Sequence, residues 1–361
     1  MFKNLGKKNI IILVTIIGLP LLLILFLIFL KGCSNKKDDY NAYENKMISS
    51  AEKYLNNKNS LPITEGGIVE VSLDDLIDSG YLAKYKGDTC TGSVYVRNNG
   101  VSVESNNGGF YNYIPKLVCN NYSTTHLIDK LMESITTSES GLYEVSDGYV
   151  FKGAKVNNYV SFFDKKYRVI SIDGNGILKL IKISSEKDRV VWDEKFNSDI
   201  DRAFGKNDYS DSNIVDILDN LYLKTSDKQK QHLVASSVCY GNRSASYTAI
   251  DKTNECSKVL DNQFISLMNV YDFALASYDK DCITIGAGAC RNYNYLFDTL
   301  GVTWTANGDS DNSYKVLYYA QGSIVSTKAS NSKKYNIVIY LDGNELYTKG
   351  DGSFENPYII K

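Results

Sequence analysis

The chain has 361 residues, with 40 Lys and Arg against 42 Asp and Glu, and a formal net charge of -2 at pH 7. This balance indicates no nucleic-acid partner and no strongly acidic partner, because neither sign of charge dominates. The length is sufficient for two domains.

Residues 10–30, IIILVTIIGLPLLLILFLIFL, form an apolar run without a charged side chain. A helix rises by about 1.5 Å per residue, so a run of this length spans a hydrocarbon core about 30 Å thick. The run predicts a single transmembrane anchor that places the protein in the cell membrane. Residues 1–9 are then a cytoplasmic tail, and the C-terminal region is extracellular. The lysines on the two sides of the run are nearly balanced and do not decide this orientation.

Cys33 follows the apolar run in LKGC, which resembles the lipobox of bacterial lipoproteins. Lys31 departs from that motif, and the run is longer than the core of a cleaved signal, which has about 7–15 residues. We therefore favour an uncleaved anchor, and lipidation of Cys33 stays open. Both alternatives place the following residues outside the cell.

Residues 34–122 predict a module of helix and sheet. Met47, Ala51 and Tyr54 share one face of a helix in residues 34–59, and Pro62 ends it. A short strand, a helix capped by Ser72 and two strand-like runs follow, TGSVYVRNN and GGFYNYIPKLVC.

The segments AEKYLNNKNSLP and VSLDDLIDSGYL resemble the pilin-like stalk modules of Gram-positive surface proteins. An anchor helix and a late disulfide also agree with the pilin plan. The prepilin peptidase signal is missing before the apolar run, so the resemblance implies a stalk or spacer. Whether the stalk assembles into a pilus-like fibre stays open.

Residues 123–141 predict a connector with one short helix, and residues 142–361 predict a second α+β module. This module opens with β-rich sequence, and DGNG at 173–176 has the composition of a hairpin turn. Helical patterns follow in SDSNIVDILDNLYL and in FISLMNVYDFALAS, where Asn269 is the expected cap. Trp192 and Trp304 are expected in the core.

The second module resembles a family of uncharacterised bacterial surface domains related to the C-type lectin-like and formylglycine-generating-enzyme folds. The resemblance rests on FFDKKYRVISI, VCYGNRSAS, ISLMNVYDFALAS, CRNYNYLF, WTANGDSDNSYKVLYYAQGSIVS and VIYLDGNELYTKGDGSFENPYII. It implies a C-type lectin-like domain over 142–361. It also implies a turn at residues 350–352 and a final edge strand or docked segment at Pro357–Ile360. The Arg-Pro of that family is replaced by Asn336-Ile337.

Seven cysteines are present, and six of them lie far beyond the apolar run. An even set in a translocated region is typical of disulfides, and without a CxxC pair the spacing fits no metal signature. Six cysteines allow fifteen pairings. We expect the sequential pairing, because crosslinks among the last four would otherwise span an intervening strand and helix: Cys90 with Cys119, Cys239 with Cys256, and Cys282 with Cys290.

No nucleophile and base stand together in a known motif. His126 and His232 are expected to be solvent-exposed. Cys282 and Cys290 could imitate the redox pair of formylglycine-generating enzymes, but CITIGAGAC favours a small disulfide loop. We therefore predict no catalytic residue and no cofactor.

NGDSDNS, residues 307–313, contains the metal candidate. Asp309, Asp311 and Asn312 supply oxygen atoms in an alternating pattern that suits calcium. The run lacks the mid-loop Gly and the distal Glu of an EF-hand loop, and the chain lacks the sugar-binding motifs of calcium-dependent lectins. A solvated turn is the alternative.

These features predict a bacterial cell-surface protein, anchored by residues 10–30, that binds a glycan or protein outside the cell. The ligand and the oligomeric state are not specified. A structural, pilin-like envelope component without a soluble ligand is the alternative. An enzyme related to the formylglycine-generating fold is the third possibility.

Overall fold

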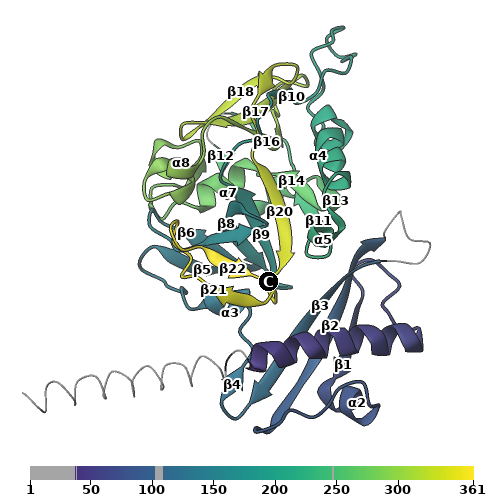
Figure 1. Ribbon diagram of the computed structural model, residues 1–361. Helices are drawn as coiled ribbons and strands as arrows, with labels where there is room; N and C mark the ends of the chain where they lie inside the picture. Colours follow the sequence, from purple (N-terminus) through teal and green to yellow (C-terminus); the bar gives the residue numbers. More distant parts are fainter. Residues whose placement is uncertain (1–36, 38, 102–108, 246–247) are drawn as a thin grey trace, which may run out of the picture. The chain divides into compact units, whose positions relative to one another are not determined.

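The computed structural model describes residues 37, 39–101, 109–245 and 248–361 (Figure 1). These residues form a mixed α+β protein built mostly from sheets. One compact unit takes in residues up to 61, 70–95 and 115–124, and a second takes in 62–69, 96–114 and 125–361. The predicted anchor at 10–30 and Cys33 lie outside the described residues. Within the described part, no helix has the length and hydropathy needed to cross a bilayer.

The first unit contains a helix over residues 39–58 and strands of a sheet in the order β1-β2-β3-β4. Met47 and Ala51 are buried along one face of the helix, as predicted, together with Tyr43 and Leu55, whereas Tyr54 is half-buried. The strands are β1 (Ile68–Ser72), β2 (Cys90–Val101), β3 (Gly109–Cys119) and β4 (Tyr122–Ser123), and β1, β2 and β3 each have residues in the second unit. Ser72 caps the short helix α2 (Leu73–Asp78) by accepting a hydrogen bond from the backbone N–H of Asp75, also as predicted.

Tyrosines join this helix to the sheet of the first unit. The ring of Tyr40 stacks on Tyr122 at 4.5 Å and on Tyr85 at 4.9 Å. The Tyr122 hydroxyl donates to Glu44 at 2.9 Å, and Thr124 donates to the same carboxylate at 2.6 Å. These contacts explain how a polar, tyrosine-rich sequence supports a packed helix and sheet.

The main sheet of the second unit has nine strands among the described residues. The strand order is β14-β20-β9-β8-β7-β22-β21, with β6 paired to β8 and β5 paired to β6. Strands β8 and β9 form the predicted hairpin, and its turn places Gly176 at φ 78°. The strands are β5 (Gly141–Val145), β6 (Gly148–Lys152), β7 (Tyr159–Phe162), β8 (Lys165–Asp173), β9 (Ile177–Lys182), β14 (Ile265–Leu267), β20 (Ile337–Asp342), β21 (Tyr347–Lys349) and β22 (Tyr358–Ile360).

Short strands and helices complete the second unit around this sheet (Figure 1). The strands are β10 (Val190–Val191), β11 (Ser236–Cys239), β12 (Thr248–Ala249), β13 (Val259–Gln263), β15 (Thr284–Ile285), β16 (Thr303–Gly308), β17 (Lys315–Ala320), β18 (Ser323–Lys328) and β19 (Ser332–Lys333). The helices are α3 (Leu127–Met132), α4 (Asn213–Leu223), α5 (Asp227–Lys230), α6 (Lys252–Glu255), α7 (Val270–Leu275) and α8 (Tyr295–Thr299), with 3₁₀ turns at Tyr209–Asp211 and Gly288–Arg291. Trp192 and Trp304 are fully buried in this unit, as predicted.

The three predicted disulfides are confirmed: Cys90–Cys119, Cys239–Cys256 and Cys282–Cys290. Asn336 occupies the position where the resembling family carries Arg, and it is 1% exposed. Its amide donates to the carbonyl of Lys182 and accepts from Ser185. A neutral side chain therefore connects the start of β20 to the end of β9 without a buried charge.

The C-terminal segment forms the expected turn and strand, but the strand is not at the sheet edge. Strand β22 lies between β7, which it pairs in parallel, and β21. Tyr358 is buried, whereas Ile359 and Ile360 are half-buried. The prediction that this strand lies at the sheet edge was wrong, because β21 pairs with β22 and takes the edge position.

We expect Tyr358→Ala to destabilise the second unit by about 3 kcal/mol, because removal of a buried aromatic side chain leaves a cavity inside the sheet. Glu355→Ala is the matched control, since Glu355 is exposed in the same segment and its loss should cost less than about 0.5 kcal/mol. Thermal unfolding of the full-length chain measures both. Equal melting temperatures for the two variants would contradict a structural role for the chain end.

Candidate functional site

The second unit contains a groove of about 1320 Å³. Residues of β6, β8, β9 and β20 line it together with residues of α6, α7 and the β11–β13 ribbon. Residues 65–68 and 97–99, which belong to the same unit, complete the lining. The groove exceeds the volume of about 300–1,000 Å³ that is usual for a small-molecule site.

A buried ion pair joins two elements that line the groove. Lys179 on β9 holds its Nζ 2.6 Å from Oδ2 of Asp272 on α7. Asp272 is fixed by the predicted cap, because Asn269 accepts a hydrogen bond from its backbone N–H at 2.8 Å. Burial lowers the pKa of Lys179, but the neighbouring Asp272 carboxylate outweighs it and the net shift is upward. The raised pKa favours the charged form of Lys179, which lies against the Asp272 carboxylate.

Glu255, at the end of α6, is 1% exposed and lines the same groove. Its carboxylate accepts from Nε of Arg243 and from the amide of Asn307, both at 2.6 Å. Asn307 also accepts from the backbone N–H of Val270 at 2.8 Å, so it connects Glu255 to the start of α7. Burial raises the pKa of Glu255 to about 7, against the opposing effects of Arg243 and Asn307. The groove thus contains a carboxyl group that titrates near neutral pH.

Residues 97–99 are held in the groove lining by contacts within the second unit. Arg97 pairs with Asp342 at 2.8 Å, and the Asn99 amide donates to the carbonyl of Gln231 at 2.6 Å. Asp342 begins a turn whose last residue, Glu345, is 2% exposed. The amide of Asn112 donates to Glu345 at 2.6 Å. Two buried carboxylates of one turn therefore fix both strands of the β2–β3 hairpin where these strands enter the second unit.

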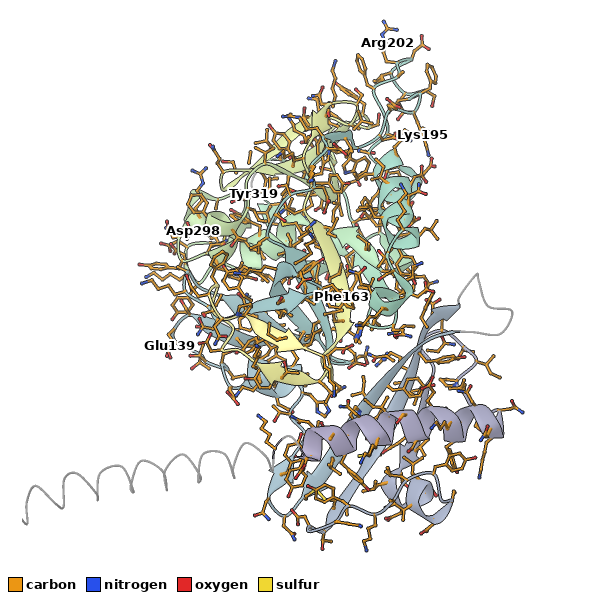
Figure 2. The ribbon with its side chains drawn as sticks, in the orientation of Figure 1. Glu139, Phe163, Lys195, Arg202, Asp298 and Tyr319 are labelled. Carbon is orange, nitrogen blue, oxygen red and sulfur yellow. A yellow bond between two sulfur atoms is a disulfide. The ribbon has the colours of Figure 1, made fainter. Side chains whose placement is uncertain are left out.

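His232 is the third partner of this turn. Its Nδ1 lies 2.9 Å from Oε2 of Glu345, and its ring packs edge-on against Phe162 and Phe163, the latter labelled in Figure 2. Burial lowers the pKa of His232, but the Glu345 carboxylate and its hydrogen bond outweigh it and raise the pKa. The imidazole is therefore charged at a higher pH than an exposed histidine.

The two histidines were wrongly expected at the surface. His126 is 8% exposed and precedes α3, and the side chain of His232 is 15% exposed. The polar sequence around His232 concealed its burial, because its partner Glu345 is 113 positions away. Sequence reasoning also missed Lys179, Glu255 and Asp272, which look like ordinary surface charges in their own segments.

The three residues considered as calcium ligands lie in a loop whose conformation is held by hydrogen bonds within the protein. Asp309 is 2% exposed, and its carboxylate accepts from Ser326 and from the backbone N–H of Asp311. Asp311 accepts from Ser244 at 2.7 Å, and the Asn312 carbonyl accepts from Asn207 at 3.0 Å. In the part of the chain that the structure describes, no three His, Cys, Asp or Glu side chains gather as metal ligands. The loop conformation is explained without an ion.

The chain matches no family model, no curated protein and no solved structure. Its function is therefore inferred from its own residues.

We expect the free energy of unfolding to fall as the pH rises above about 6.5, the ordinary pKa of histidine. The raised pKa of His232 means that the folded state binds its proton more tightly, so the stabilisation is complete below that pH and is lost above it. Urea unfolding across pH 6 to 9 measures this slope. His232→Gln and Glu345→Gln should each reduce it, and an unchanged slope in both variants would refute the ion pair as its cause.

Proposed function

We propose that the chain is a bacterial cell-surface protein that binds a glycan or protein ligand in the groove of its second unit. The groove is the observation that carries this proposal, because it combines large volume with buried, hydrogen-bonded polar groups and partly exposed aromatic residues. Binding sites typically have this composition, in which a few fixed polar groups orient the ligand and apolar surface contributes affinity. Tyr149, Phe264 and Tyr271 supply the aromatic surface.

Within this proposal, residues 10–30 are the membrane anchor, the first unit is a pilin-like stalk, and the second unit is a C-type lectin-like domain. The three disulfides support an extracellular position, because such bonds persist mainly in oxidising compartments. The helix over residues 39–58 together with a small four-stranded sheet supports the pilin-like plan.

The alternative function is a structural envelope component that assembles through its stalk. Strand β1 favours it, because β1 is the edge of the four-stranded sheet and its Glu70, in the first unit, is exposed. An open sheet edge can pair with another chain. Ordered self-assembly of the purified protein would favour this alternative.

Protease added to intact cells should remove the second unit if the C-terminal region is extracellular. The anchored remainder should be detected with an antibody to an N-terminal tag. Full protection of the chain, while a known outer protein is digested in the same sample, would refute this topology.

A screen of the full-length chain in detergent against glycan and extracellular-protein arrays tests the binding function. A ligand of the groove should lose at least about tenfold in affinity with Ser237→Trp, because Ser237 is an exposed lining residue and the indole fills the groove. Ser310→Trp is the matched control, since Ser310 is exposed and is not among the lining residues. Equal binding by both variants would exclude the groove as the binding site.

A further inference from the structure

The charges that line the groove are unequal. Six carboxylates and three cations contribute to it: Glu65, Asp147, Asp173, Glu255, Asp261 and Asp272, against Arg97, Lys179 and Lys252. Each cation already has a carboxylate partner, since Arg97 pairs with Asp342, Lys179 with Asp272 and Lys252 with Asp147. Each cation of the described lining thus has a carboxylate beside it, and only Nε of Arg97 among their nitrogen atoms is a buried donor without an acceptor.

Three of the lining carboxylates have no ion-pair partner among the described residues. Glu65, Asp173 and Asp261 are exposed in the groove lining. Asp173 accepts from the backbone of its own turn, and Asp261 accepts from Ser237 at 2.5 Å, so both orientations are fixed. Fixed carboxylates without a counter-charge attract cations, and a concave surface strengthens this attraction.

A buried acceptor gives independent evidence for a ligand. Asn99 is 2% exposed and lines the groove, and its amide nitrogen is already bound to the carbonyl of Gln231. Its Oδ1 has no donor anywhere in the described part of the chain. An acceptor in this state carries a desolvation cost that a ligand with N–H groups relieves.

We propose that the groove binds its ligand through an ammonium or guanidinium group, which donates hydrogen bonds to Asn99 and is attracted by Glu65, Asp173 and Asp261. This inference rests on the proposed binding function and names the chemistry of the ligand. Tyr149 and Tyr271 line the same groove, and aromatic faces bind both kinds of cation. The volume of about 1320 Å³ suits a Lys- or Arg-bearing peptide segment better than a free amine.

Binding of a fluorescent hexalysine peptide to the full-length chain in non-ionic detergent tests the proposal. Hexaglutamate is the charge control, and spermine is the second arm. Spermine and unlabelled hexalysine are each used to displace the fluorescent peptide. If spermine competes as strongly as hexalysine, the source of the cation is a free amine. If spermine competes more weakly than hexalysine, the source is a peptide. The affinity for the cation should fall as the salt concentration rises, since exposed charges are screened.

The triple variant Glu65→Gln, Asp173→Asn, Asp261→Asn should weaken hexalysine binding by about tenfold, because each exposed carboxylate contributes modestly. The amides retain an oxygen acceptor at each position, so the turn and the Ser237 hydrogen bond are preserved. The matched control is Glu52→Gln, Glu70→Gln, Glu355→Gln, which removes the same charge from exposed positions outside the lining. Asn99→Ala should also weaken binding, and melting temperatures identify any variant that fails to fold.

No binding of either cation, or equal weakening by the two triple variants, would overturn the cationic ligand. The array screen separates that failure from failure of the binding function. The arrays could instead identify a neutral ligand whose binding is blocked by Ser237→Trp and is unaffected by the lining triple variant. That result would refute the proposal of a cationic ligand and would keep the groove as the binding site. Failure of the arrays and of both cations would refute both proposals.

Discussion

The structure of the second unit depends on the cost of burying charge at the turn from Asp342 to Glu345. A carboxylate removed from water is tolerated only when it is paired and hydrogen-bonded. Asp342 and Glu345 satisfy this condition with Arg97, His232 and Asn112, which come from three separate segments. The turn backbone adds two more connections, because the carbonyls of residues 343 and 345 accept from the first residues of α3. Removing Arg97 or His232 would leave Asp342 or Glu345 without its cation, which is destabilising for a buried carboxylate.

The buried charges that line the groove also have partners of opposite charge. Its deep charges are neutralised inside the protein, Lys179 by Asp272 and Glu255 by Arg243. Arg243 and Glu255 also belong to the loop that Cys239–Cys256 closes, so the disulfide restricts the segment that brings this pair together. The carboxylates without an ion-pair partner are the more exposed ones of the lining, Glu65, Asp173 and Asp261.

Local features of the fold could be predicted from the sequence, and contacts between distant residues could not. The hairpin at 173–176, the caps Ser72 and Asn269 and the three disulfides depend on neighbouring residues or short loops. The groove depends on pairs such as Asn112 with Glu345, which are 233 positions apart. In the sequence, Glu345 belongs to the ordinary turn composition DGNE, and nothing in that segment indicates burial. Periodicity identifies an element and its buried face, but not which distant charge will be placed against it.

The position of β22 has a consequence for the time at which the protein can fold. A ribosome makes the chain from its N-terminus, yet residues 358–360 insert between β7 and β21 inside the main sheet. The sheet therefore remains open along β7 until residues 358–360 have emerged from the ribosome. The three disulfides, with sequence separations of 29, 17 and 8 residues, all join cysteines that precede this strand in the sequence. The main sheet is therefore completed only when residues 358–360 join β7 and β21, which places its closure late in the order of synthesis.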